Sequence, residues 1–303
     1  MRTVYLGTSE FAVTVLRRLA NSPHRPVLVA TPPDRPRGRG RKLAPPPVAA
    51  SAAELGIELH QTSRVSEPGS VERIRTAGAE VGVVCEFGQL IREPLLSRLE
   101  MLNVHPSLIP RWRGAAPIER TIMAGDAETG VTVMRVEAGL DSGAVALAEA
   151  VPVEPSDDYG TLSARLAEVS GELIVRALDL RAAGGLEFTE QDDSRATYAE
   201  KISPGERRLD PAHRAIDLER TVRALNPHIG AYLELDDGRR LGVGAASAEG
   251  GSLPVGRLAV DGLALRLGCG EGLLRLDVVQ PPGKRPMAAE AYLRGHPPPK
   301  VAA

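Results

Sequence analysis

The sequence predicts an α/β protein in which a Rossmann-like, mostly parallel sheet precedes a small β-domain. In the first part of the 303-residue chain, short apolar runs alternate with segments of helical spacing, as in strands joined by crossover helices. Beyond about residue 206 the pattern changes to short runs separated by Asp-Gly turns, which indicate hairpins. We therefore predict a first domain over 1–188, a linker over 189–205 and a C-terminal domain over 206–303.

The chain opens on a predicted strand, turn and helix. Residues 3–7 form an apolar run, TVYLG, and the next segment has helical spacing, with Ser9 placed to cap the helix and Glu10 in its first turn. The turn has a single glycine, Gly7, where a dinucleotide-binding turn has three. We therefore expect neither a nicotinamide nor a flavin cofactor.

The alternation continues through the first domain. The next strand and helix runs are VLVA, PVAASAAELG, IELHQ, VERIRTAG, VGVVCE, REPLLSRL and LNVH. Pro117 suits the first turn of a helix, and strands over 131–136 and 144–153 have a Gly-rich link short enough for an antiparallel pair. A long helix over 159–183 closes the domain, and the polar segment 189–205 lacks any apolar period, so it reads as a linker.

The C-terminal domain begins with a predicted helix over 212–225. Hairpins follow over 231–246 and 256–267, and a last strand covers 272–280. About five short strands in a small domain favour a closed barrel of the oligonucleotide-binding (OB) type.

Composition limits the class of protein. The two cysteines lie far apart, the first residues lack the apolar stretch of a secretion signal, and no apolar run is long enough to cross a bilayer, so we expect a reduced, cytoplasmic protein without a membrane role. The six histidines show no metal-ligand spacing, and we expect no metal. A net charge of −2 is neutral overall, yet residues 35–42, RPRGRGRK, carry five cations and no acid. This run is either a site for a polyanion or a solvated loop.

Polar residues gather at one predicted sheet edge. Asn103 and His105 end the LNVH strand at alternate positions, so both side chains face one way. In open α/β sheets the ligand lies at the carboxyl ends of the strands, where CEFG (85–88) also ends and where Asp141 is within reach. Each residue alone has a plain alternative: a turn amide, a buried imidazole or a turn carboxylate. Their combination favours a catalytic site.

Three neighbouring residues leave alternatives open. Trp112, the single tryptophan, fits a core or interface anchor. Arg111 and Arg113 are equally consistent with binding an anionic ligand and with a solvated surface. Gly114 and the alanines after it permit close backbone approach at a helix start.

These residues resemble the methionyl-tRNA formyltransferase family along almost the whole chain. The matching segments are LGTSEFA, PPDRPRGRGRKL, NVHPSLIPRWRGAAPIERTIMAGDAETGVTVM, GLDSG, TYAEKIS and LNP. The resemblance implies a formyltransferase domain and an OB-like tRNA-binding domain, with 10-formyltetrahydrofolate as formyl donor and initiator methionyl-tRNA as partner. We expect a monomer, although the sequence itself does not give the oligomeric state.

The resemblance also implies which residues act. It assigns the catalytic trio to Asn103, His105 and Asp141, with amide and imidazole donating to the formyl oxygen and Asp141 orienting the imidazole and stabilising its protonated form. Folate contacts fall on Ser107, Leu108, Ile109, Pro110, Glu86, Phe87 and Gly88, and tRNA contacts on Arg37, Arg39, Arg41 and Lys42.

The chain departs from the family at two places. The family usually has an Ala-Tyr-Gly-like turn where this chain has Glu86, Phe87 and Gly88, and it commonly has a tryptophan where His228 stands. The alternatives are a related formyltransferase acting on glycinamide ribonucleotide or a sugar nucleotide, a formyltetrahydrofolate hydrolase, and a non-catalytic RNA-binding protein.

Overall fold

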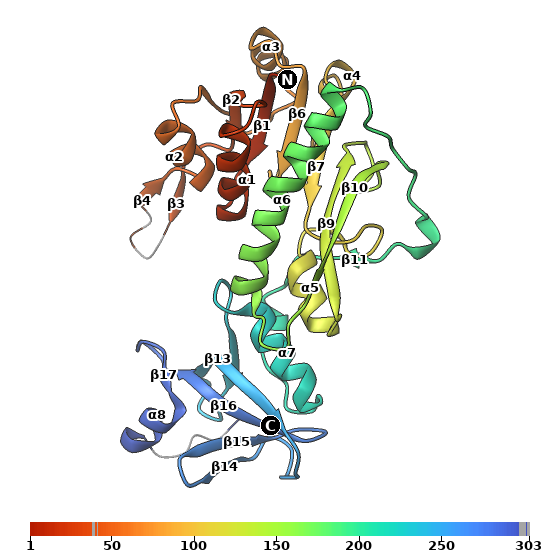
Figure 1. Cartoon of the computed structure of the whole chain (residues 1–303). Helices are drawn as coiled ribbons and strands as arrows, with labels where there is room; N and C mark the ends of the chain where they lie inside the picture. The colour runs from red at the N-terminus through yellow and green to blue at the C-terminus, as the bar shows by residue number, and fades with distance from the viewer. Residues whose placement is uncertain (38–39, 41, 297–300, 302–303) are drawn as a thin grey trace. The chain divides into compact units, whose positions relative to one another are not determined.

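The computed structural model describes residues 1–37, 40, 42–296 and 301, with the side chain of Arg37 left out. The chain divides into two compact units (Figure 1). Unit 1 comprises Met1–Gly114, Glu128–Pro152 and Ser163–Tyr198, and unit 2 comprises Ala115–Ala127, Val153–Leu162 and Ala199–Ala303. The boundaries proposed above from sequence stay a prediction.

Unit 1 is built on a seven-stranded sheet with the order β10-β9-β7-β6-β1-β2-β5. The strands are β1 (Thr3–Gly7), β2 (Pro26–Thr31), β5 (Leu59–Gln61), β6 (Val81–Cys85), β7 (Met101–His105), β9 (Glu128–Arg135) and β10 (Val145–Pro152). The first five are parallel, whereas β9 runs antiparallel to both β7 and β10. The mostly parallel sheet predicted from the sequence is therefore confirmed.

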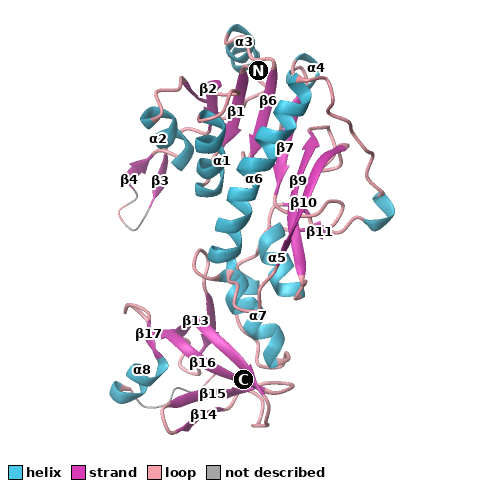
Figure 2. Ribbon diagram, in the orientation of Figure 1, coloured by secondary structure: helices cyan, strands magenta, loops and turns pink. Residues whose placement is uncertain are grey.

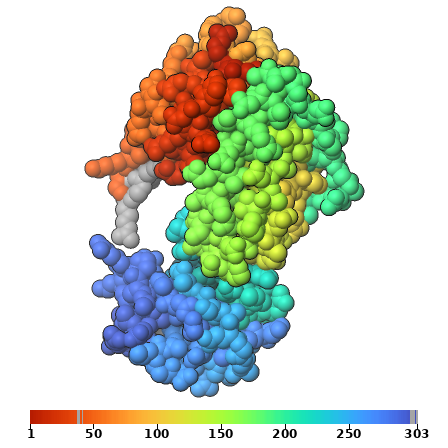
Figure 3. Space-filling view, in the orientation of Figure 1, coloured from red at the N-terminus to blue at the C-terminus, as the bar shows by residue number. Residues whose placement is uncertain are grey.

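Helices cover this sheet. They are α1 (Glu10–Ala20), α2 (Pro47–Glu54), α3 (Pro68–Thr76), α4 (Leu95–Arg98) and most of α6 (Tyr159–Ala182). The Ser9 side chain accepts a 3.1 Å hydrogen bond from the Ala12 N–H, which is the predicted cap of α1. Figures 2 and 3 show α1 and α6 side by side, and a Cβ on Gly171 of α6 would lie 2.8 Å from Arg18 Cβ, so glycine permits this close approach. Within the described ranges, no helix combines the length and apolarity needed to span a membrane.

Short elements complete unit 1. Strands β3 (Arg35–Arg37) and β4 (Lys42–Ala44) form an antiparallel hairpin. The two-residue strands β8 (Arg113–Gly114) and β11 (Tyr198–Ala199) pair, and a 3₁₀ turn covers Asp193–Arg195. The segment predicted as a linker is thus hydrogen-bonded to the loop that follows β7.

Unit 2 carries an antiparallel sheet with the order β12-β13-β16-β15-β14, with β17 paired to β16. Its elements are α5 (Pro117–Ala124), a 3₁₀ turn (Gly205–Arg207), α7 (Ala215–Leu225), β12 (Ala231–Glu234), β13 (Arg240–Glu249), β14 (Leu258–Asp261), β15 (Ala264–Gly268), β16 (Leu273–Gln280), β17 (Met287–Ala288) and α8 (Ala289–Gly295). Both predicted hairpins are present, and leucines such as Leu233, Leu265 and Leu276 bury one face of the sheet with α7. The antiparallel strands are confirmed, and the OB-like barrel stays a prediction.

An ion pair inside unit 2 makes a pH-dependent contribution to stability. Arg120 on α5 donates to Glu206, which also accepts from the Ser203 N–H at 2.8 Å. The hydrogen bond from Arg120 is the main cause that lowers the pKa of Glu206 from 4.5 to about 2. A depressed carboxyl pKa stabilises the fold fully above about pH 4.5, and this stabilisation is lost as the pH falls toward about 2.

We expect Glu206→Gln to lower the free energy of unfolding by about 1 kcal/mol at pH 7, a figure discounted for solvent screening because the two side chains are 19% and 36% exposed. The difference in free energy of unfolding between parent and variant should disappear as the pH falls from 4.5 toward 2. Denaturant titration over that range measures it, with Glu200→Gln as the control. A gap that is independent of pH contradicts the assignment.

Candidate active site

The end of β7 places two of the predicted catalytic side chains. Asn103 and His105 lie two residues apart in this strand, and His105 is only 4% exposed. The His105 Nε2 atom lies 2.9 Å from the carbonyl oxygen of Trp112. Because a carbonyl can only accept, Nε2 carries a hydrogen, and Nδ1 is the nitrogen left for chemistry.

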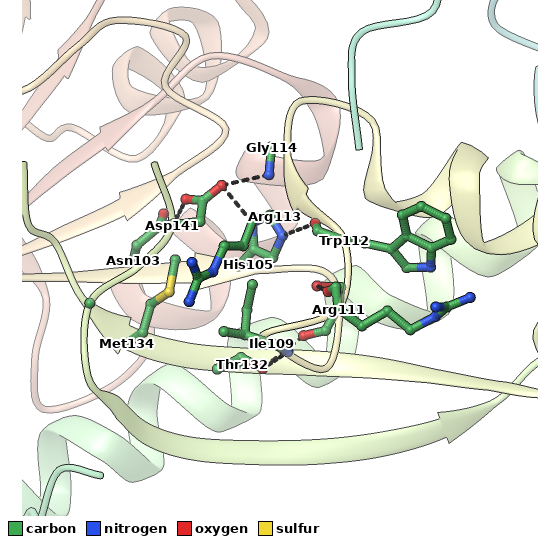
Figure 4. Close-up of polar contacts among 12 residues, drawn as sticks. Asn103, His105, Ile109, Arg111, Trp112, Arg113, Gly114, Thr132, Met134 and Asp141 are labelled. Atoms are coloured by element: carbon green, nitrogen blue, oxygen red, sulfur yellow. Dashed lines mark hydrogen bonds and ion pairs between the residues drawn. The ribbon is translucent and has the colours of Figure 1, made fainter. Parts of the chain in front are cut away.

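The Asp141 carboxylate lies near that nitrogen and contacts three neighbouring groups (Figure 4). Its Oδ1 accepts from Asn103 Nδ2 at 3.3 Å and its Oδ2 accepts from the Gly114 N–H at 2.9 Å. The same Oδ2 lies 3.7 Å from His105 Nδ1, which is ion-pair range when the imidazole is protonated. Asp141 holds a left-handed backbone with φ of 46°. The structure thus brings amide, imidazole and carboxylate to one place.

The segment predicted to contact folate, Ser107 to Pro110, is fixed against β9. Thr132 donates through its hydroxyl to the Ser107 carbonyl at 2.7 Å and accepts from the Ile109 N–H at 3.3 Å. Ser107 is buried, and its hydroxyl donates to the Arg111 carbonyl at 2.7 Å, so its side chain serves the loop. Leu108, Ile109 and Pro110 remain partly exposed as an apolar segment.

The turn after β6 is anchored to the start of α1. Glu86, with φ of 44°, accepts from the Ser9 hydroxyl, and Thr8 donates to the Phe87 carbonyl at 2.8 Å. The Phe87 side chain is buried in the core, so only its backbone is available to a ligand, and Gly88 is exposed. The departure at Glu86 therefore has a structural use, because a carboxylate suits a helix N-terminus.

Cys85 ends β6 beneath this turn. Burial raises the pKa of its thiol well above the usual value, and the nearby Glu86 carboxylate raises it further. Only a thiolate is nucleophilic. The thiol stays protonated at neutral pH, which argues against a role for Cys85 as a nucleophile.

The structure places all three residues of the Arg-Trp-Arg segment and decides between the alternatives left open for Arg113. Trp112 is partly exposed rather than in the core, and the Arg111 guanidinium carbon lies 4.4 Å from its ring centroid. Arg113 points the opposite way from both in Figure 4 and is 4% exposed. Its guanidinium donates to Gln191 and Asp193, so neither a solvated surface nor a free anion site describes Arg113.

Sequence reasoning missed two functional contacts here. One is the Trp112 carbonyl, since a backbone group gives no signal in the sequence. The other is Gln191, in the predicted linker, which donates to the carbonyls of Asp141 and Gly143. The only hint was one amide in an otherwise charged stretch, EQDD.

The predicted tRNA-contacting loop is described in part. Arg37 and Lys42 pair across the β3–β4 hairpin, and Lys42 is exposed. Arg39 and Arg41 lie outside the described residues. In the described part of the chain, no group of three or more His, Cys, Asp or Glu side chains is placed to hold a metal ion.

Known families match both parts of the chain. The formyl transferase family matches residues 1–178, and the formyl transferase C-terminal domain matches residues 201–297. Sheet, site and matched families together define a formyl-transferring class of enzyme.

Curated relatives narrow that class. A methionyl-tRNA formyltransferase of Methylobacillus flagellatus is 42% identical, covering 98% of this chain and 97% of that relative. One of Methylobacterium sp. is 43% identical, covering 97% and 96%. The chain belongs to the methionyl-tRNA formyltransferase family.

Solved structures share the fold at low identity. HypX from Aquifex aeolicus, in complex with tetrahydrofolic acid, is 17% identical with a TM-score of 0.67, covering 97% of this chain and 47% of that protein. The sugar 3N-formyl transferase WlaRD is 13% identical with a TM-score of 0.65, covering 94% and 99%.

Proposed function

We propose that this chain transfers a formyl group from 10-formyltetrahydrofolate to the α-amine of initiator methionyl-tRNA. The observation that carries the proposal is the convergence on Asp141 of the Asn103 amide and the His105 imidazole. A charged-tRNA substrate places the reaction in the cytoplasm. The monomeric state stays a prediction.

The residues present fit a folate donor. Partly exposed Leu108, Ile109 and Pro110 offer an apolar segment suited to an aromatic ring system. They follow His105 in sequence, and Thr132, which binds the Ile109 N–H, is the partner of His105 in the β7–β9 register. The bound folate would supply the formyl group on its N10 atom. Leu108 to Pro110 and the backbone of Phe87 and Gly88 would hold it.

The trio suits acyl transfer to an amine. Negative charge develops on the acyl oxygen in such a reaction, and preorganised donors stabilise it most. Asn103 provides an amide N–H for that oxygen. His105 in its imidazolium form provides Nδ1–H, because its Nε2–H is already bonded to the Trp112 carbonyl.

Asp141 organises both donors and supports proton removal. Its oxygens accept from Asn103 and Gly114, and its Oδ2 lies 3.7 Å from His105 Nδ1, within ion-pair range of a protonated ring. An α-amine has a reference pKa of about 8, so a modest proton acceptor is enough. Asp141 can take that role through water, because its side chain is 17% exposed.

The basic run at 35–42 favours a tRNA substrate over the related amines. A glycinamide ribonucleotide or sugar-nucleotide formyltransferase, or a formyltetrahydrofolate hydrolase, has no use for a run of five cations without an acid. A non-catalytic RNA-binding protein would leave the assembled trio without a purpose.

The deciding experiment incubates the chain with 10-formyltetrahydrofolate and charged initiator tRNA. Formylmethionyl-tRNA should form at a rate proportional to enzyme. Parallel reactions contain no tRNA, glycinamide ribonucleotide or an amino-sugar nucleotide. Folate consumption without tRNA, or faster transfer to a small amine, would assign the chain to one of the alternatives.

We expect Asp141→Asn to lower turnover roughly a hundredfold. The amide removes the charge beside His105. Its NH₂ also faces either the Asn103 amide or the Gly114 N–H, each of which is a donor itself. The measurement is single-turnover formylation at saturating folate and tRNA.

The matched control for Asp141→Asn is Asp179→Asn, which disrupts another imidazole–carboxylate pair of unit 1, the 2.8 Å contact with His24. Asp179→Asn should retain near-parental turnover. Equal losses in the two variants would reduce Asp141 to a turn residue.

A further inference from the structure

A side-chain amide in the predicted linker bridges the loop that carries Asp141. Gln191 Nε2 donates to the carbonyl oxygens of Asp141 at 2.9 Å and Gly143 at 2.7 Å. The first carbonyl belongs to Asp141 itself, whose backbone is left-handed with φ of 46°, and the second lies two residues further along the same turn. Residues with this backbone persist where surrounding contacts determine them, and Gln191 supplies two such contacts from 50 residues away in sequence.

Arg113 fixes which way that amide points. Its Nε and Nη2 both donate to Gln191 Oε1, at 3.0 and 2.7 Å. Because the guanidinium has only donors, the amide oxygen must face it and the NH₂ must face the two carbonyls. A flipped amide would place its NH₂ against the Arg113 guanidinium, which also donates, and its oxygen against the two carbonyl oxygens.

Arg113 is itself buried and held by contacts of its backbone and its side chain. It is 4% exposed, its backbone N–H donates to the Thr197 carbonyl at 2.9 Å, and its Nη2 lies 2.6 Å from the 80% exposed carboxylate of Asp193. In the sequence, Arg113 lies between Trp112 and Gly114. The Trp112 carbonyl accepts a hydrogen bond from His105, and the Gly114 N–H donates one to Asp141. One short segment therefore touches both the imidazole and the carboxylate.

We propose that Gln191, oriented by Arg113, is a positioning residue that holds Asp141 in register with Asn103 and His105. The inference rests on the proposed function. Gln191 touches none of the three predicted catalytic side chains, and it acts by fixing the backbone from which Asp141 projects. Loss of this support should reduce turnover, since a misplacement of about 1 Å costs roughly a hundredfold.

The test replaces Gln191 with Glu, which keeps the size and the acceptors for Arg113. The new carboxylate cannot donate, and it sets an oxygen against the Asp141 and Gly143 carbonyls. Turnover should fall roughly tenfold to a hundredfold, with the KM for tRNA within about twofold of the parent. Gln280→Glu is the control, because it removes a similar 2.9 Å amide-to-carbonyl bond, to Lys284, in unit 2.

A double-mutant cycle separates positioning from general damage. If Gln191 acts through Asp141, Gln191→Glu should change turnover less than about twofold in an Asp141→Asn background. A merely structural role gives the same fold loss in both backgrounds and overturns the proposal. Arg113→Lys keeps the charge but lacks the two guanidinium donors to Gln191. Its effect on turnover should also be smaller in the Asp141→Asn background than in the parent.

Hydrogen exchange tests the inference without catalysis. The Gly114 amide, bonded to Asp141 Oδ2, should exchange roughly tenfold faster in Gln191→Glu, while amides of β1 in the sheet core keep the parental rate. A parent without formyl transfer would defeat the proposed function, yet faster Gly114 exchange would still support the positioning role. An active parent, with unchanged turnover and exchange in the variant, would defeat the positioning role alone.

Discussion

His105→Ala should lower the turnover of formyl transfer by roughly a hundredfold or more, the usual effect of losing one donor to a developing oxyanion. The buried imidazole is the one ring that ends β7 beside Asp141, and alanine leaves neither nitrogen in its place. Binding of tRNA should change little, because the predicted phosphate contacts lie elsewhere in the chain. Single-turnover formylation beside a tRNA-binding assay measures both.

The effect of this substitution must be separated from loss of folding, since alanine also removes the hydrogen bond from His105 to the Trp112 carbonyl. His24→Ala is the matched control: His24 is 3% exposed and lies 2.8 Å from Asp179. Both variants should lose stability, but only His105→Ala should lose turnover per folded molecule. Near-parental turnover in His105→Ala removes the assignment of His105 as a donor.

Much of this arrangement could be predicted because it follows from local rules. Alternate residues of a strand face one side, and ligands in open α/β sheets lie at the carboxyl ends of strands. These two rules are enough to place Asn103 and His105 together at the carboxyl-end edge of the sheet, where a ligand is expected. The hairpins of unit 2 are equally local, since Asp-Gly between apolar runs fixes their turns.

The rest depends on contacts between distant segments. The polar stretch around Gln191 has the composition of a linker, and only tertiary structure shows it bonded to the loop at 141–143. Arg113 was equally consistent with a solvated surface, because burial of an arginine is decided by partners such as Asp193 that lie 80 residues away. The tautomer of His105 depends on a backbone carbonyl, which every residue has and no side-chain pattern reveals.

We propose that the hairpin of β3 and β4 attracts the tRNA substrate, while the predicted catalytic trio carries out the chemistry. The hairpin strands bring Arg37 opposite Lys42, within a run of five cations free of acids. Other arginines of unit 1, such as Arg17 and Arg75, are paired with acids instead. A cation already paired with a carboxylate has less to gain from a phosphate, so the run at 35–42 should dominate attraction of tRNA.

Replacing Arg37, Arg39, Arg41 and Lys42 together with alanine should therefore reduce formylation of methionyl-tRNA steeply and flatten its dependence on salt. Each lost phosphate contact lowers the slope of log affinity against log salt by about 0.9. Affinity for the folate should persist, because its predicted contacts follow β6 and β7. The measurements are formylation rate and tRNA affinity across a salt series, beside folate affinity at one salt concentration.

A second quadruple variant tests whether position or total charge matters. It replaces four exposed, acid-paired arginines of unit 1 with alanine: Arg17, Arg64, Arg73 and Arg75. Both variants lose four positive charges, but only the loop variant should lose rate and salt dependence. If the two behave alike, long-range charge alone attracts tRNA. If the loop variant formylates tRNA as fast as the parent at every salt concentration, the hairpin is a solvated surface feature, and the tRNA contact must be sought elsewhere in the chain.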